Sequence, residues 1–136
     1  MIHIIITAYG EPNTTERAIR AFLEQNIQED YEIIFSDPFT ETKWMIEEKF
    51  PDTKRIRFFE DHGKGKSNAL NILFNEIYPK GKDDILILTD GDVYVSNDSV
   101  KAILKQFEKP EVGCVSGRPV SVNPRSDKFG YWSHFL

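Results

Sequence analysis

Hydrophobic positions fall into two kinds of run that alternate along the chain. The first kind is short, rich in β-branched residues and nearly continuous, which is typical of strands buried on both faces of a sheet. The second kind repeats its apolar residues at helical spacing and ends at a proline or a polar turn. The expected strands are residues 2–7, 31–36, 56–59, 85–88 and 112–115, and the expected helices are about 13–26, 40–50, 67–77 and 98–110.

Particular residues mark where these elements begin and end. Asn13, with Glu16 three residues later, matches a helix cap, and Pro79 ends the third helix. The run 85–88 is the most apolar, so we expect it to be the most deeply buried strand. Cys114 falls in the expected fifth strand, where it is interpreted as a small buried residue.

Alternation of strands and helices predicts an α/β fold with a Rossmann-like, mostly parallel sheet and helices on both faces. Neither a linker nor an internal repeat interrupts the chain, so residues 1–136 are expected to form one domain. Ligands of such sheets bind outside the carboxyl ends of the strands. Polar residues follow the first, second and fourth strands and fill the loop after the third. We therefore expect the functional site at that edge.

Charge and composition narrow the function classes. Seventeen Lys and Arg against 22 Asp and Glu give a net charge of −5, and the chain has no basic stripe of the kind that binds nucleic acid. Cys114 is the single cysteine, which excludes an internal disulfide framework. The apolar runs are strand-sized and no signal sequence precedes the first one. We therefore expect a cytoplasmic protein, held at the cytoplasmic membrane face if a longer parent protein carries a tether.

Two carboxylates follow the fourth strand, at Asp90 and Asp92. On an extended chain they point the same way, and Gly91 allows the chain to bend so that they converge. Carboxylates in this place suit Mg²⁺ or Mn²⁺, which also takes phosphate oxygens as ligands. The alternative is an Asp-Gly turn without a metal.

Two further features are compatible with a nucleotide. Asp37 ends the second strand, where an acidic residue can accept a hydrogen bond from a nucleoside, although Asp37-Pro38 can equally begin a turn. Residues 63–68 form a loop with Lys64 and Lys66 that opens a helix and can bind phosphate, although solvated loops of this kind are common.

The aromatic residue after the first strand and the three histidines give little further indication of function. Tyr9, after the first strand, can stack on a base or pack on a helix, and packing is the usual outcome for a single aromatic side chain. The histidines at positions 3, 62 and 134 have no metal-ligand spacing, and no role is assigned to them.

Taken together, these motifs resemble those of the family 2 glycosyltransferases, which have the GT-A fold. The resemblance covers residues 2 to 118, with one departure, Pro38-Phe39 in place of the family's usual Asp-Gly. The matching segments, in order, are 8–11 (AYGE), 32–37 (EIIFSD), 65–71 (GKSNALN), 90–92 (DGD, the family's Asp-x-Asp) and 112–118 (VGCVSGR).

The resemblance implies inverting transfer of a sugar from a nucleotide-diphosphate donor to an acceptor hydroxyl. By that resemblance Asp37 hydrogen-bonds the base, and a UDP-sugar is favoured over a GDP-sugar. Asp90 lies near the ribose and the metal, Asp92 binds Mn²⁺ or Mg²⁺, and Lys66 or Lys64 lies near the phosphates.

The resemblance also implies that the turn of residues 8–11 lines the nucleoside pocket, with Ala8, Tyr9 and Glu11 as its contributing residues. The family's general base lies well beyond the Asp-x-Asp motif, and no catalytic residue is identified here. We therefore expect a donor-binding domain that lacks the acceptor half, and an acceptor (glycan, lipid or protein) that stays unknown. The aromatic tail, residues 129–136, is expected to mediate self-association.

Two other functions are compatible with parts of the pattern. A non-catalytic nucleotide- or protein-binding module would account for the lack of an identified general base. A haloacid dehalogenase phosphatase also uses Asp-x-Asp after a strand, but there the motif follows the first core strand, whereas three strand–helix units precede it here.

Overall fold

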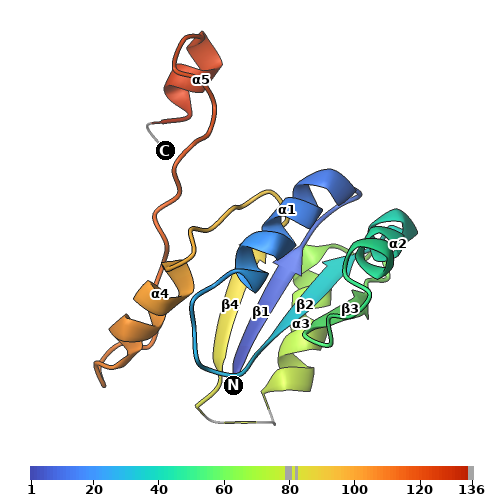
Figure 1. Ribbon diagram of the computed structural model, residues 1–136, viewed down its shortest axis with the longest axis vertical. Coiled ribbons are helices and arrows are strands. Elements are labelled where there is room, and N and C mark those ends of the chain that lie inside the picture. Colours follow the sequence, from blue (N-terminus) through green and yellow to red (C-terminus); the bar gives the residue numbers. More distant parts are fainter. Residues whose placement is uncertain (79–80, 82, 135–136) are drawn as a thin grey trace. The chain divides into compact units, whose positions relative to one another are not determined.

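The computed structural model describes residues 1–78, 81 and 83–134 (Figure 1). Four strands and five helices are assigned within these residues. In chain order they are β1 (Ile2–Thr7), α1 (Pro12–Leu23), β2 (Tyr31–Asp37), α2 (Thr40–Lys49), β3 (Ile56–Glu60), α3 (Lys66–Ile77), β4 (Ile85–Asp90), α4 (Ser99–Phe107) and α5 (Lys128–Trp132).

The four strands form one parallel sheet in the order β3-β2-β1-β4. β1 lies between β2 and β4, so that Ile4 is paired with both Ile33 and Ile87. Because all four strands run the same way, their carboxyl ends meet at a single edge. This confirms the predicted α/β, Rossmann-like architecture.

Helices cover both faces of the sheet: α3 lies on one face, and α1 and α2 on the other (Figure 1). On the α3 face, Ile5 and Ile34 form a fully buried cluster with Leu73 and Ile77 of the helix. Strand alternation turns Ile4 and its partner on β2, Ile33, toward the opposite face. Both faces of β1 and β2 are therefore buried from solvent, which explains their nearly continuous apolar sequences.

β4 corrects the prediction that it is the most deeply buried strand. Its residues alternate between half-buried and exposed, and Leu86 and Leu88 are 42% and 52% exposed. The reason is the strand order, because β4 lies at the edge of the sheet with β1 on one side. A run of four apolar residues cannot distinguish an edge strand from a central one.

Two more predictions are wrong in detail. Asn13 is not a helix cap, because α1 begins one residue earlier at Pro12, whose ring presets the backbone angle of a first helical residue. Residues 112–115 form no strand, and Cys114 there is exposed. A strand needs a partner for its backbone hydrogen bonds, and no partner strand is described for this segment.

The chain divides into two compact units, residues 1–101 and 102–136. The sheet, with α1, α2 and α3, belongs to the first. In the second, the Asp127 side chain caps α5 by accepting a hydrogen bond from the backbone N–H of Gly130.

Two predictions fall on residues that the structure does not describe. Phe135 and Leu136, at the end of the aromatic tail, lie outside the described residues, and self-association through this tail stays a prediction. Pro79, the predicted end of α3, also lies outside them. None of the helices in the described part of the chain has the length and apolarity needed to span a bilayer.

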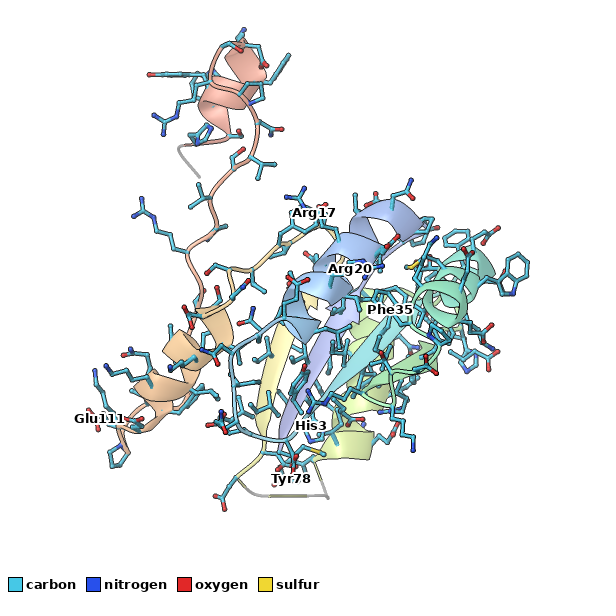
Figure 2. The ribbon with its side chains drawn as sticks, viewed as in Figure 1. His3, Arg17, Arg20, Phe35, Tyr78 and Glu111 are labelled. Atoms are coloured by element: carbon cyan, nitrogen blue, oxygen red, sulfur yellow. The ribbon has the colours of Figure 1, made fainter. Side chains whose placement is uncertain are left out.

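A charged network ties the strands together at the end opposite the carboxyl edge, where Figure 2 shows His3. His3 is 1% exposed, and its ring nitrogens lie 2.6 Å from Glu32 Oε1 and 3.0 Å from Asp84 Oδ2. Asp84 also accepts a hydrogen bond from the N-terminal amine of Met1 at 2.8 Å. This bond, followed by the one with His3, lowers the pKa of Asp84. The network thus links β1 to β2 and to the residue that precedes β4.

The α3 face provides a test of core packing. Leu73→Ala should lower the free energy of unfolding by about 2–5 kcal/mol, because Leu73 is fully buried against Ile5 and Ile34. The adjacent Ile72, which is 40% exposed, is the matched control, and Ile72→Ala should cost much less. Urea unfolding of both variants measures the difference. Equal losses would contradict the assigned face of α3.

The Asp84 network predicts a pH dependence. Because the pKa of Asp84 is lowered in the folded protein, the stabilisation that it provides is present above its unfolded pKa of about 3.9 and is lost as the pH falls through the folded value. Asp84→Asn should therefore be less stable than the parent near pH 6, and this difference should shrink below about pH 4. Chemical unfolding across this range measures it, with Asp83→Asn as the control for net charge. A difference that does not change with pH would contradict the assignment.

Candidate functional site

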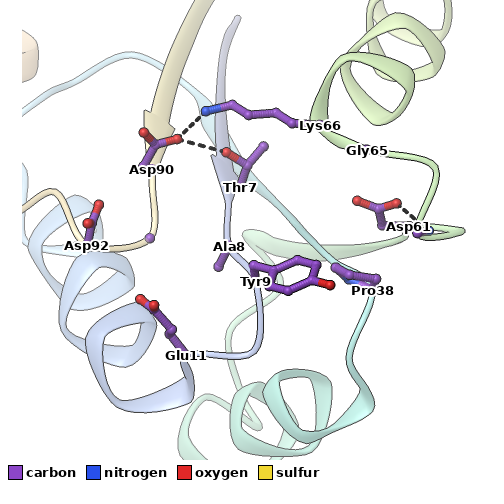
Figure 3. Close-up of a pocket in the computed structure, with 12 residues that line it drawn as sticks. Thr7, Ala8, Tyr9, Glu11, Pro38, Asp61, Gly65, Lys66, Asp90 and Asp92 are labelled. Carbon is purple, nitrogen blue, oxygen red and sulfur yellow. Dashed lines mark hydrogen bonds and ion pairs between the residues drawn. The ribbon is translucent and has the colours of Figure 1, made fainter.

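A pocket of about 490 Å³ opens at the carboxyl edge of the sheet (Figure 3). Its volume is typical of small-ligand sites. Segments that follow all four strands contribute to its wall, as the topology requires. The lining residues are Thr7, Ala8, Tyr9, Glu11, Pro38, Asp61, Gly63, Gly65, Lys66, Asp90, Gly91 and Asp92.

Of the predicted site residues, all but Asp37 and the alternative lysine Lys64 lie on this wall. The wall brings together the turn after β1, the first residue of α3 and both carboxylates after β4. Figure 3 shows Glu11, Asp92 and Asp90 along one side and Tyr9, Pro38 and Asp61 along the other. The pocket therefore has a carboxylate side and an aromatic side.

Tyr9 forms the aromatic side and is 74% exposed. Its ring meets Phe39 edge-on, with the ring centroids 4.9 Å apart. Phe39 is the N-cap residue of α2, so Tyr9 touches the start of that helix, but most of its side chain stays exposed to the pocket. Exposed aromatic faces of this kind bind bases by stacking.

Asp37 does not line the pocket and is 1% exposed. Its carboxylate accepts hydrogen bonds from the backbone N–H of Gly10 at 3.0 Å, the backbone N–H of Phe39 at 2.9 Å and the hydroxyl of Thr42 at 2.8 Å. These bonds join the turn after β1 to the turn after β2 and to α2. In this structure the oxygens of Asp37 are hydrogen-bonded inside the protein, and its contact with a base stays a prediction.

The turn at residues 90–93 is packed tightly against β1. The backbone N–H of Gly91 donates to Thr7 O at 2.9 Å, and the N–H of Val93 donates to Asp90 O at 3.2 Å. A Cβ atom on Gly91 would lie 2.8 Å from Ala8 Cβ and 2.9 Å from Thr15 Oγ1, so a larger residue cannot replace this glycine without displacing β1 or α1. The Asp-Gly turn is real, and it presents Asp90 and Asp92 to the pocket.

Lys66 and Asp90 form an ion pair across the pocket. The Lys66 ammonium is the main cause of a lowered pKa at Asp90, against the opposing effect of partial burial, and the Thr7 hydroxyl adds a hydrogen bond of 3.1 Å. Asp90 is therefore held ionised. Both side chains are more than half exposed, so each can exchange its partner for a ligand.

The glycine loop before α3 brings its helix terminus to the pocket. Gly65 has a φ of 92°, a conformation that favours glycine, and is the residue before the first turn of α3. Lys66 is the first residue of the helix and lines the pocket, whereas Lys64 is exposed and lies outside the lining. The structure thus separates the two lysines that the sequence left as alternatives.

Sequence reasoning missed Asp61. This half-buried residue follows β3 and lines the pocket beside Pro38 (Figure 3). Its carboxylate accepts hydrogen bonds from the backbone N–H of Gly63 at 2.9 Å and the Ser36 hydroxyl at 3.4 Å. The available signal was an acidic residue at the end of a predicted strand, the same signal that drew attention to Asp37.

The carboxylate side fits a divalent cation that completes its coordination with ligand oxygens. No group of three His, Cys, Asp or Glu residues with metal-site geometry occurs in residues 1–78, 81 and 83–134. Mg²⁺ needs no such group, because it binds through one or two carboxylates together with phosphates and water. A further oxygen without a partner lies close to this turn. The buried hydroxyl of Thr15, near Gly91, has no hydrogen-bond partner among the described atoms.

Comparison with solved structures supports the fold. The chain matches a mannosyltransferase, PcManGT from Pyrobaculum calidifontis, solved in complex with GDP-Man and Mn²⁺, with a TM-score of 0.71 and 23% identity over 97% of this chain and 37% of that one. It also matches S. aureus TarS 1–349 with a TM-score of 0.64 and 14% identity, over 93% of this chain and 40% of that one. At these identities the likeness establishes the fold. The chain spans about two fifths or less of each structure.

A search of curated proteins found no match. The family comparison is more direct, because the model of the family described as Glycosyl transferase family 2 matches residues 3–134, nearly the whole chain. The ordered motifs, the parallel sheet and the carboxylates at its carboxyl edge all agree with this match. The chain belongs to glycosyl transferase family 2.

Proposed function

We propose that the pocket at the carboxyl edge binds a nucleotide-diphosphate sugar together with Mn²⁺ or Mg²⁺, for transfer of the sugar to an acceptor hydroxyl. The observation that carries the proposal is the division of one pocket into a carboxylate side with a lysine and an aromatic side. Such a donor has matching parts, a diphosphate and a base. The PcManGT structure, which holds GDP-Man and Mn²⁺, has the same fold.

Asp92, with Asp90 beside it, would hold the cation. Asp92 is exposed at the pocket wall, and Asp90 is ionised. A divalent cation bound here supplies neutralisation of the charge that develops on the leaving diphosphate. Lys66, the first residue of α3, would bind a phosphate oxygen, and the N-terminus of a helix also favours an anion.

The aromatic side would hold the nucleoside. Tyr9 offers an exposed ring face, and Ala8 precedes it on the wall. Glu11, which the resemblance also assigns to the nucleoside pocket, lines the pocket on the side of Asp90 and Asp92 (Figure 3). Asp37 supports the aromatic side, because its hydrogen bonds fix the turn that carries Tyr9.

Transfer with inversion would be a single displacement. The acceptor oxygen forms a bond to the anomeric carbon while the bond from that carbon to the diphosphate oxygen breaks, with the electron pair leaving on the diphosphate. The acceptor proton passes to a general base. No residue of the described chain is assigned to that role.

A second candidate is a nucleotide-binding module without transfer. It is compatible with the pocket, in which no described residue is assigned as a general base. Turnover of a nucleotide sugar by this chain alone would reject it.

The cation requirement is tested by thermal stability with nucleoside diphosphates, in Mn²⁺ and then in EDTA. A nucleotide at one hundred times its Kd should stabilise the protein by about 2.7 kcal/mol, and only with the metal present. Asp92→Ala should abolish this shift. Asp52→Ala, an exposed carboxylate outside the pocket lining, is the control and should leave it unchanged. Stabilisation that persists in EDTA would contradict the metal role.

The phosphate role of Lys66 is tested against its neighbour Lys64. Lys66→Gln should weaken nucleoside diphosphate binding by about 10- to 100-fold, the usual range for a lost hydrogen bond to a charged group. Lys64→Gln removes the same charge from the same loop and should change the affinity much less, since Lys64 does not line the pocket. Titration calorimetry measures both. Equal effects would mean that the loop acts through its net charge alone.

A further inference from the structure

Two carboxylates lie near the nucleoside side of the pocket, and only one of them is available. Asp37 is 1% exposed and binds two backbone N–H groups and a hydroxyl. Asp61 is half-buried and lines the pocket opposite Asp90 and Asp92 (Figure 3). Figure 3 shows Asp61 on the same side of the pocket as Tyr9, so Asp61 is the carboxylate offered to a base that binds against Tyr9.

The hydrogen bonds of Asp61 fix its direction and leave it capacity. The backbone N–H of Gly63 binds Oδ1, and the Ser36 hydroxyl binds Oδ2. A carboxylate has about four acceptor positions, two on each oxygen. One position on each oxygen is thus left for a ligand, and a carboxylate with a free position on both oxygens can accept two N–H donors.

Among the common bases, guanine alone presents two adjacent donors, N1–H and the 2-amino group, on its Watson–Crick edge. Uracil and thymine present one N–H between two carbonyl oxygens, which a carboxylate repels. Cytosine and adenine present one amino group beside a ring nitrogen that is an acceptor. A site that hydrogen-bonds a substrate group strongly rejects an analogue without it, because its own polar atoms are left unpaired.

We propose that Asp61 selects the base of the donor and that the base is guanine, an inference that rests on the proposed function of the pocket. It replaces the sequence-based preference for a UDP-sugar, which depended on Asp37 as the base contact. Asp61 is the specificity-determining residue, and Asp37 is a positioning residue that holds the turn of Tyr9.

The experiment compares four diphosphates on the same chain, with Mn²⁺ present. GDP carries both donors, inosine diphosphate lacks the 2-amino group, xanthosine diphosphate has a carbonyl oxygen in its place, and UDP has one N–H. In the parent protein GDP should bind about tenfold or more tighter than each of the other three. This ligand series needs no variant, so it stands even if a substitution prevents folding.

Asp61→Asn then tests the residue itself. The amide has one acceptor and one donor, which match the N1–H and the carbonyl of xanthine, so the variant should lose GDP affinity by about tenfold or more and gain affinity for xanthosine diphosphate. Asp52→Asn is the control for charge and should change neither affinity. Asp37→Asn should instead lower the melting temperature without ligand, since it places an amide donor against three donors.

The outcomes separate this inference from the proposed function. Tight GDP binding with the xanthine switch in Asp61→Asn supports both. Metal-dependent binding of UDP in preference to GDP, or GDP binding that Asp61→Asn leaves unchanged, overturns the inference and keeps the proposed function. Absence of binding by every diphosphate overturns the proposed function, and the inference with it.

Discussion

The buried carboxylate of Asp37 is the interaction on which the pocket depends. It lies at the end of β2 and binds the turn after β1, the turn after β2 and the first part of α2. A buried carboxylate is costly unless its oxygens are hydrogen-bonded, and here backbone and hydroxyl donors satisfy both. The stable arrangement of this one side chain therefore fixes two loops relative to each other. Those loops carry Tyr9 and Pro38, which line the aromatic side of the pocket.

The architecture was largely predictable from the pattern of apolar runs. β1 and β2 have continuous apolar sequences because they are central strands with both faces covered, and the carboxyl edge follows from parallel pairing. β4 was misjudged because strand order is a long-range property, and Leu86 and Leu88 have the same local sequence character as buried leucines. The expected strand at 112–115 failed for a related reason, since a strand depends on a partner that its own sequence does not specify.

The site was predictable as a set of loops, and less so as a set of contacts. The sequence could single out Asp90, Asp92 and Lys66 because their residue types and motifs suggest metal or phosphate binding. Asp37 and Asp61 could not be told apart, because both follow a strand and precede a turn. Burial and the direction of nearby N–H groups separate them, and these are set by how the loops fold over one another. That one carboxylate is buried and the other lines the pocket is a property of the tertiary structure.

The pairing of Lys66 with Asp90 has a consequence for how ligands would enter. Each side chain satisfies the other, and a polyphosphate that takes Lys66 leaves Asp90 without its counter-ion. A divalent cation that binds Asp90 likewise leaves Lys66 without its counter-ion. Binding of either one therefore lowers the cost of binding the other, and by thermodynamic linkage the gain is reciprocal. The ion pair would make the anion and the cation cooperative partners, so that neither alone fills the pocket as well as the two together.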